Sequence, residues 1–481
     1  MTYNLIDEPW IPVLRTNGRV NRVGIRAALT EAKSIRQIAA PSPLDRLAIL
    51  RFLLAVQYWC EGSPSPQQSN SSTGSLSPEG LSKLDSKRED FELFGKDRRF
   101  YQFGGASSSQ LLSVNYLLHE IPTGTNVSHF RHSKDGVDGL CPSCCATGLV
   151  RLPVFTTMGG QGKGPGINMA PPIYAVPLGE SLHQTLQISL VPVADADLGN
   201  PAWELPDAKL PQGGTVPLLN GLTWLPRRVW LEEPGDTEKP CISCGRKERL
   251  VMRMVFAGRG KTRTGTWHDP HTLPSMRRGS LSAGLRPANT LKRSDAAAGQ
   301  WVSVIESLLS RQPPKSEGGV PALCFVVAFL TDQNKYLDAV EWLVPTESSP
   351  VTKAAFVRSS KRWERGWDST ALLRRVVPGA SGPRRNGETM RLRSLLDHVR
   401  PNVEQEAVVR AMAWLKSGQE DEWGSSTENY QRMLALISET LFPGPTISAV
   451  EHRRQVTQGS TSRAVGAKMK SPRVTVRRSG P

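Results

Sequence analysis

Two CxxC pairs, Cys141/Cys144 and Cys241/Cys244, constrain the fold of this chain more than any other sequence feature. Each pair presents two thiols from one tight turn, and two such turns together supply the four sulfurs of a tetrahedral zinc site. An odd number of cysteines, seven in all, favours a metal in a reducing compartment over a disulfide framework. A closed four-cysteine site predicts a structural role for Zn²⁺, with Cys145 as an alternative ligand beside the first pair.

A glycine-rich segment follows the first cysteine pair, with Gly159, Gly160 and Gly162 before Lys163. It lacks the GKS or GKT ending of a P-loop, which argues against nucleotide hydrolysis. Glycines allow close backbone approach, so this segment could enter a narrow groove where Lys163 meets a phosphate or a base edge. A flexible surface loop is the alternative interpretation.

The charge balance points to a polyanionic partner. The 60 Lys and Arg residues exceed the 44 Asp and Glu residues and give a net charge of +16. Such an excess favours nucleic acid through counterion release. The final segment, 452–481, has basic residues and no acidic ones, and it either contacts phosphate or is a solvated tail.

A long segment without periodicity, 121–139, predicts a loop in which one aromatic residue lies among cationic ones. Phe130 is followed by Arg131, His132 and Lys134. This combination suits stacking on a base while phosphates are held, although a packing role for Phe130 is the alternative.

Two further stretches carry candidate chemistry. Trp267–His271, WHDPH, places two imidazoles and a carboxylate together, and Arg277 and Arg278 follow it on a predicted loop suited to phosphate. Thr331–Asn334, TDQN, separates two apolar runs and predicts the tip of a β-hairpin.

Hydrophobic periodicity predicts an α+β chain of two domains. A buried helix is expected over 44–59. Short apolar runs bounded by Pro and Gly predict strands over 186–193, 216–224, 228–233, 250–258 and 324–332. Amphipathic segments predict helices over 371–377, 392–399, 403–415 and 430–441. We therefore expect a large mixed domain with the zinc site over 1–365 and a helical bundle of four-helix type with a basic tail over 366–481.

The sequence predicts neither a membrane-spanning helix nor a secretory signal peptide. The longest apolar run, Pro321–Leu330, is shorter than the roughly 20 residues that a membrane helix needs. Asp7 and Glu8 stand where a secretory peptide would have positive charge. We expect a cytoplasmic protein.

Several of these motifs together resemble the large subunit of the type I-E CRISPR Cascade complex, the CasA family. They are the opening LIDEPWIPV, both cysteine pairs, the glycine loop with its lysine, WHDPH with basic residues after it, and a helical C-terminal end. Their order and approximate spacing match over nearly the whole chain, and the opening is the most specific element. The resemblance implies a subunit that is not an enzyme and that reads the protospacer-adjacent motif of target double-stranded DNA from the minor groove.

The resemblance also implies partners and site residues. The expected partners are the backbone, small and 5′-handle-binding Cascade subunits, the guide RNA, the target DNA, and a helicase-nuclease recruited after R-loop formation.

The resemblance assigns site residues to five groups. The motif-reading loop would comprise Gly159, Gly160, Gly162 and Lys163. The basic loop would use Arg277 or Arg278, where the family pattern has lysine. A wedge that opens the first base pair would comprise Asp332, Gln333 and Asn334, with Gln333 matching the family's glutamine. The segment that docks on guide RNA and neighbouring subunits would comprise Phe130, Arg131, His132 and Lys134. The zinc ligands would be Cys141, Cys144, Cys241 and Cys244.

Two other functions remain open from the sequence. One is a metal-dependent nuclease that uses Trp267–His271. The other is a zinc-stabilised RNA-binding scaffold protein with no preference for duplex DNA.

Overall fold

The structure is a computed structural model of the whole chain. It describes residues 2–64, 76–103, 111–119, 139–157, 164–168, 171–207, 209–210, 213–259, 265–272, 323–332 and 335–345. The chain divides into two compact units, Met1–Lys353 and Ala354–Pro481. The predicted helical bundle over 366–481 and the predicted boundary near residue 365 lie outside the described residues, so both stay predictions.

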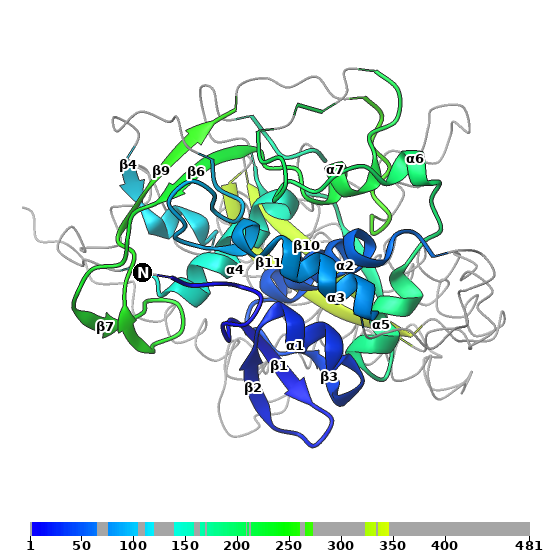
Figure 1. Cartoon of the computed structure of the whole chain (residues 1–481), viewed down its shortest axis with the longest axis horizontal. Coiled ribbons are helices and arrows are strands. Elements are labelled where there is room, and N and C mark those ends of the chain that lie inside the picture. Colours follow the sequence, from blue (N-terminus) through cyan, green and yellow to red (C-terminus); the bar gives the residue numbers. More distant parts are fainter. Residues whose placement is uncertain are drawn as a thin grey trace, which may run out of the picture. The chain divides into compact units, whose positions relative to one another are not determined.

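The described residues of the first unit form a mixture of helices and strands (Figure 1). Its described helices are α1 (Ile25–Thr30), α2 (Pro43–Glu61), α3 (Pro78–Ser86), α4 (Pro142–Phe155), α5 (Leu182–Ser189), α6 (Asp195–Leu198) and α7 (Leu218–Leu222), with 3-10 turns η1 (Ala32–Ser34), η2 (Arg88–Phe91) and η4 (Val114–Leu117). Its described strands are β1 (Ile11–Arg15), β2 (Val20–Val23), β3 (Ile35–Ile38), β4 (Leu111–Ser113), β5 (Tyr174–Leu178), β6 (Arg227–Leu231), β7 (Glu238–Pro240), β8 (Lys247–Arg249), β9 (Arg253–Gly258), β10 (Leu323–Asp332) and β11 (Lys335–Pro345).

The strands form small antiparallel sheets. The N-terminal sheet has the order β2-β1-β3, and the other two three-stranded sheets have the orders β4-β9-β6 and β11-β10-β5. β7 and β8 form a separate two-stranded ribbon. In the third of these sheets, Tyr174 of β5 lies opposite Val327 of β10, so a segment from the middle of the chain pairs with a distant hairpin.

Helix α2 is the centre of the core. Pro43 occupies its first turn and Asp45 lies at its positive end, both of which favour a helix start. Its side chains from Leu44 to Trp59 are almost all buried because α1, α3, α4, α5 and α7 pack around it. The predicted helix over 44–59 is confirmed. No helix within the described residues combines the length and apolar character needed to cross a membrane.

Aromatic side chains bind α2 to the segments around it. Phe52 of α2 meets Trp203 edge-on with ring centroids 5.8 Å apart. Phe100 stacks on Tyr101 at 4.3 Å and on Phe91 at 5.8 Å. Such pairs add to the free energy gained by burying apolar area, so this cluster fixes the loops before β4 on the central helix.

Two of the predicted strands are wrong and three are confirmed. The segment 186–193 belongs largely to α5, whose buried residues Leu182, Thr185, Leu186 and Ser189 have helical spacing that begins upstream of the predicted strand. The segment 216–224 contains the short helix α7. The runs at 228–233, 250–258 and 324–332 contain β6, β9 and β10, as predicted.

Candidate metal centre and nucleic-acid interface

Four cysteine sulfurs form a compact cluster, with all four Sγ atoms within 4.8 Å of one another. Cys141 caps the N-terminus of α4, and Cys144 lies in the first turn of that helix. Cys241 and Cys244 lie in the turn between β7 and β8, where Gly245 adopts a φ of 71°. A residue without a Cβ adopts this conformation readily, so Gly245 lets the turn close behind the second pair. The structure therefore brings together the four residues predicted from the two CxxC pairs.

Backbone hydrogen bonds hold the two halves of the cluster in place. Leu140 and Val251 exchange N–H···O bonds of 3.0 and 2.9 Å, and Ile242 N donates to Gly139 O at 3.2 Å. These bonds join the segment before α4 to the β7–β8 ribbon on either side of the sulfurs. The cluster is thus part of a continuous backbone framework.

The donor set fits a zinc ion. Zn–S bonds of about 2.3 Å in a tetrahedron give S···S edges of about 3.8 Å. The Sγ atoms of Cys141 and Cys244 lie 3.7 Å apart. Cys145 is not part of the set, because its Sγ points at the carbonyl oxygen of Leu140 at 3.8 Å. Four thiolates would leave no open coordination position, which suits a structural ion rather than a catalytic one.

The electrostatics of the cluster favour thiolate on Cys241 and Cys244, because hydrogen bonds from the Cys141 and Cys144 thiols lower the pKa of both. The pKa of Cys241 falls to about 6. The hydrogen bond of Cys144 to Cys141 raises the pKa of Cys144. Arg246 adds positive charge by donating its Nη2 to Cys141 Sγ at 3.6 Å. Thiolates are the form in which cysteine binds a metal.

Helix α4 joins the cysteine cluster to the predicted glycine loop. It has 14 residues, which corresponds to about 21 Å of helix. It packs closely on η4, since a Cβ on Gly148 would lie 2.7 Å from Leu117 Cβ. The helix ends shortly before 158–163, a segment outside the described residues that contains Gly159, Gly160, Gly162 and Lys163. Helix α4 thus connects the cluster with the N-terminal flank of that loop.

The two flanks of the glycine loop are tied together by one buried arginine. Arg227 donates its Nη2 to Thr157 O at 2.6 Å and its Nη1 to Gly164 O. Beside this bridge, Gly166 N donates to Thr156 O at 3.0 Å. Burial lowers the pKa of Arg227 to about 10, so its guanidinium remains charged at neutral pH. Arg227 therefore sets the separation between the points where the loop leaves the core and returns to it.

The predicted hairpin is confirmed in its strands. β10 and β11 pair antiparallel, with Asp332 opposite Lys335. The register shifts between Leu330 and Thr331, and such an irregularity increases the local twist of a strand pair. Gln333 and Asn334, between the two strands, lie outside the described residues.

The side chains of Asp269 and His271 in the WHDPH stretch are buried in the protein core. Asp269 is fully buried and forms an ion pair with Arg51 of α2, with Oδ1 2.7 Å from Nη1. His271 Nδ1 lies 2.8 Å from the same guanidinium nitrogen, whereas His268 is exposed. A carboxylate that is paired with a guanidinium in the core is a poor ligand for a catalytic cation. This arrangement argues against the nuclease interpretation.

The other predicted site residues have no described structure. They are Arg277 and Arg278 of the basic loop, and Phe130, Arg131, His132 and Lys134 of the docking segment. Their predicted roles stay predictions.

Sequence reasoning overlooked Arg51 and Arg227. Arg51 did carry a signal, because it interrupts the apolar run of α2 at a position where only a paired charge is tolerated. Arg227 begins a short strand beside Arg228, and nothing in the local pattern distinguishes the buried arginine from its half-exposed neighbour.

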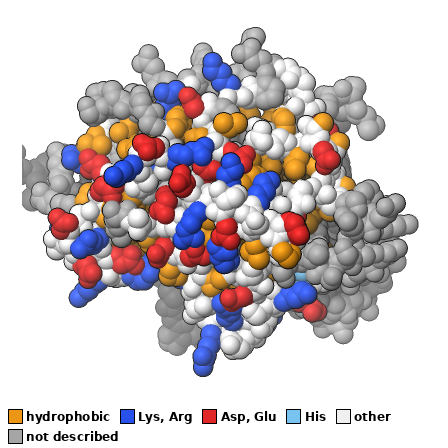
Figure 2. Space-filling model, in the orientation of Figure 1, with side chains coloured by type: hydrophobic (Ala, Val, Ile, Leu, Met, Phe, Trp, Pro, Cys, Tyr) orange, Lys and Arg blue, Asp and Glu red, His pale blue; other side chains and the backbone are white. Residues whose placement is uncertain are grey.

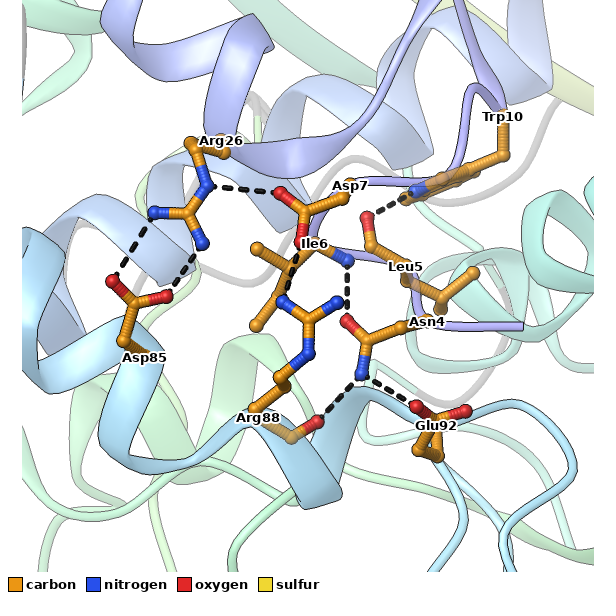
Figure 3. A network of polar contacts seen from close by, with 9 residues as sticks. All are labelled: Asn4, Leu5, Ile6, Asp7, Trp10, Arg26, Asp85, Arg88 and Glu92. Carbon is orange, nitrogen blue, oxygen red and sulfur yellow. Dashed lines mark hydrogen bonds and ion pairs between the residues drawn. The ribbon is translucent and has the colours of Figure 1, made fainter. Parts of the chain in front are cut away.

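The opening motif forms a hydrogen-bonded turn (Figure 3). The Nδ2 of Asn4 donates to Arg88 O and to Glu92 Oε1, both at 2.9 Å. Its Oδ1 accepts from the backbone N–H of Ile6. Trp10, fully buried, donates its indole N–H to Leu5 O at 3.0 Å. The first residues therefore fold into a turn before β1 begins.

Asp7 is the second anchor of this turn. Its carboxylate pairs with Arg26 at 2.9 Å and with Arg88, and Arg26 also pairs with Asp85 of α3 (Figure 3). Burial on its own would raise the pKa of Asp7, but hydrogen bonds from Arg26 and Arg88 outweigh it and lower that pKa. The most specific sequence element of the chain thus has a structural role here.

The surface around these elements carries mixed charge. Figure 2 shows Lys and Arg side chains interspersed with Asp and Glu over the described part of this face. A single basic area is not visible there. Phosphate contacts on this face would therefore depend on a few placed side chains more than on a broad positive field.

Comparisons with known proteins agree with this fold. A family model described as CRISPR-associated protein Cse1 matches residues 4–318. A protein of Thermus thermophilus, described as CRISPR-associated protein CasA/Cse1, is 32% identical over 321 residues. That alignment covers 60% of this chain and 64% of the relative, so the match spans less than two thirds of the relative's length.

Solved structures match over more of the chain. Thermus thermophilus CasA (Cse1) superimposes with a TM-score of 0.66 at 22% identity, covering 96% of this chain and 99% of that one. Cse1 from Acidimicrobium ferrooxidans gives a TM-score of 0.60 at 17% identity, covering 97% and 98%. A chain of a CRISPR RNA-guided surveillance complex gives 0.63 at 15% identity, covering 95% and 99%. At these identities the likeness shows a shared mixed helix-and-sheet fold.

Proposed function

This chain belongs to the Cse1 family of CRISPR-associated proteins, and from that membership we propose that it acts as the large subunit of a type I-E Cascade surveillance complex. In this role it reads the protospacer-adjacent motif of target double-stranded DNA and starts R-loop formation, without catalysing a reaction. The family match over residues 4–318 carries the proposal. A chain of similar fold occurs in an RNA-guided surveillance complex, which supports guide RNA and other Cascade subunits as partners in the cytoplasm.

Three segments contact the DNA in this proposal. They are the glycine loop with Lys163, the basic loop with Arg277 or Arg278, and the β10–β11 tip with Asp332, Gln333 and Asn334. The structure on either side of two of these segments supports the proposal. Arg227 bridges the two flanks of the glycine loop, and β10 and β11 pair up to Asp332 and Lys335 on either side of the hairpin tip. The minor groove distinguishes A·T from T·A poorly, so such a reader accepts several related motifs.

Zinc has a supporting role in this proposal. Cys141, Cys144, Cys241 and Cys244 hold the ion and fix the N-terminus of α4, the helix that leads to the glycine loop. The Phe130 segment docks on the guide RNA and the neighbouring subunits. The helicase-nuclease is recruited after the R-loop has formed.

Replacing Gln333 with alanine tests the wedge and, with it, the proposed function. We expect R-loop formation by the reconstituted complex to slow about fivefold, because opening the first base pair costs a few kcal/mol that an inserted side chain partly offsets. Docking on an unopened duplex should change less than about twofold, since the groove contacts remain. Docking is measured by competition between duplexes that differ only in the flanking motif. Equal losses in both assays would contradict the wedge, and a lack of motif preference in the wild-type complex would favour an RNA scaffold.

Replacing Lys163 with alanine tests the phosphate contact of the glycine loop. The plot of log K against log salt concentration has a negative slope, and we expect its magnitude to decrease by about one unit. The reason is that binding releases one counterion fewer when the charge of Lys163 is removed. Filter binding of the complex to a motif-containing duplex at several salt concentrations measures the slope. Lys163→Arg is the matched control and should retain it. An unchanged slope in the alanine variant would rule out the phosphate contact.

A further inference from the structure

A buried polar network surrounds the carboxylate of Asp269. Arg51 donates its Nη1 to Oδ1 at 2.7 Å and its Nη2 to Oδ2 at 2.8 Å, which makes the pair bidentate. The two side chains are 3% and 0% exposed. A bidentate pair fixes orientation as well as distance, so the carboxylate is held in one geometry on α2.

The same carboxylate binds the segment that returns from the glycine loop. Asn168 donates its Nδ2 to Asp269 Oδ2 at 2.8 Å and also to Tyr174 Oη at 3.2 Å. Tyr174 in turn donates its hydroxyl to Val154 O in α4 at 2.9 Å. The chain on both sides of the glycine loop, α4 before it and Asn168 after it, therefore reaches one network.

The network also binds the stems of the two other predicted DNA contacts. Tyr174 begins β5 and lies opposite Val327 of β10, the first strand of the hairpin. Ala175 N donates to His271 O at 2.7 Å, which ties β5 to the WHDPH stretch. Described structure stops at Thr272 on the way to Arg277 and Arg278. Asn168, Arg51 and His271 thus meet at Asp269, and β10 is joined to them through its pairing with β5.

The charges of this pair stabilise each other. Burial on its own would raise the pKa of Asp269, and the guanidinium of Arg51 outweighs burial and lowers it. Burial alone would likewise lower the pKa of Arg51, and the charge of Asp269 raises it. Both groups are therefore ionised at neutral pH.

We propose that the Arg51–Asp269 pair is a positioning hub that sets the glycine loop, the basic loop and the β10–β11 hairpin relative to one another. This inference rests on the proposed function of those three segments. A buried ion pair contributes little net stability compared with well-packed apolar side chains, whereas its fixed geometry specifies how the segments around it are placed. The Arg51–Asp269 pair affects DNA recognition only by positioning these three segments.

The test separates positioning from stability by removing both charges together. Arg51→Met with Asp269→Leu replaces the pair by apolar side chains of similar size, so we expect a melting temperature within about 3 °C of the wild type. We expect R-loop formation by the reconstituted complex to fall about tenfold, since small displacements of contacting groups have large effects on a rate. Arg99→Met with Glu233→Leu is the control. The Arg99 side chain is 8% exposed and pairs with Glu233 at 2.9 Å, and neither residue belongs to α4 or to the three segments proposed to contact DNA, so loss of this pair should leave R-loop formation unchanged.

Asn168→Ala gives a second test that leaves no buried charge unpaired. It disconnects the return of the glycine loop from Asp269, and we expect an R-loop rate about threefold lower with an unchanged melting temperature. The proposal is overturned if the double variant is stable and forms R-loops at the wild-type rate. If the double variant does not fold, a wild-type rate of R-loop formation in Asn168→Ala overturns it instead. If Gln333→Ala and Lys163→Ala also leave DNA binding unchanged, the proposed function fails. If those two variants are impaired and the hub variants are not, only the hub is wrong.

Discussion

Replacing Cys144 with serine is expected to remove zinc from the chain and to lower its free energy of unfolding by about 4 kcal/mol. The reason is geometric: the four Sγ atoms lie within 4.8 Å of one another, in a donor set that fits one ion. Three remaining sulfurs would hold the ion weakly, and the N-terminus of α4 would keep only its backbone hydrogen bonds to the region of the β7–β8 ribbon among the links described above. Metal analysis of the purified chain and its melting in denaturant measure the two effects.

Cys145→Ala is the matched control for this prediction. Cys145 is adjacent in sequence and fully buried, but its Sγ points away from the cluster toward Leu140 O. The control should retain one zinc ion per chain and lose about 1 kcal/mol from the small cavity. A Cys144→Ser chain that keeps its zinc and its stability would show that the cluster does not bind zinc as inferred.

Zinc removal should also affect DNA recognition through α4. The helix begins at Cys141 and ends shortly before the glycine loop, so a loosened N-terminus changes the position of the loop's first flank. The cysteine cluster and the glycine loop lie close together in the sequence, and helix α4 connects them in the structure.

The sequence predicted those features whose signal is local or repeated. Each CxxC pair is a complete turn, and the two pairs predicted the metal ligands that the structure brings together. Helix α2 was predictable because its apolar residues span five turns, and the hairpin because two apolar runs flank one polar tip.

The sequence could not predict contacts that depend on the tertiary fold. The partners of Arg51 and Arg227 are far from them in sequence: Arg51 pairs with Asp269, and Arg227 donates to carbonyl oxygens that any residue could supply. The short segments α5 and α7 were read as strands because a few apolar residues fit either period, and burial against α2 decides between them. The opening motif was recognised by its residues, yet its role in a turn became visible only with Arg26 and Arg88 in place.

Replacing Arg227 with methionine is expected to weaken binding of the complex to a motif-containing duplex by about 30-fold, the equivalent of about 2 kcal/mol. Arg227 donates to both flanks of the glycine loop, at Thr157 O and Gly164 O, and its loss leaves both carbonyl oxygens without that donor. The loop would then sample more conformations, and Lys163 would meet the DNA only in a fraction of them. We therefore expect the salt slope of the variant to approach that of Lys163→Ala.

A control and a double variant distinguish loop placement from a general loss of stability. Arg259→Met removes another buried arginine, 7% exposed, which donates to Leu225 O at 2.9 Å and pairs with Asp207 at 3.3 Å. It should cost similar stability and leave duplex binding intact. Combining Arg227→Met with Lys163→Ala should weaken binding no more than Arg227→Met alone, because the two residues act through one contact. Additive losses would mean that Arg227 stabilises the fold without positioning Lys163, and the bridge across the loop flanks would then have no part in DNA recognition.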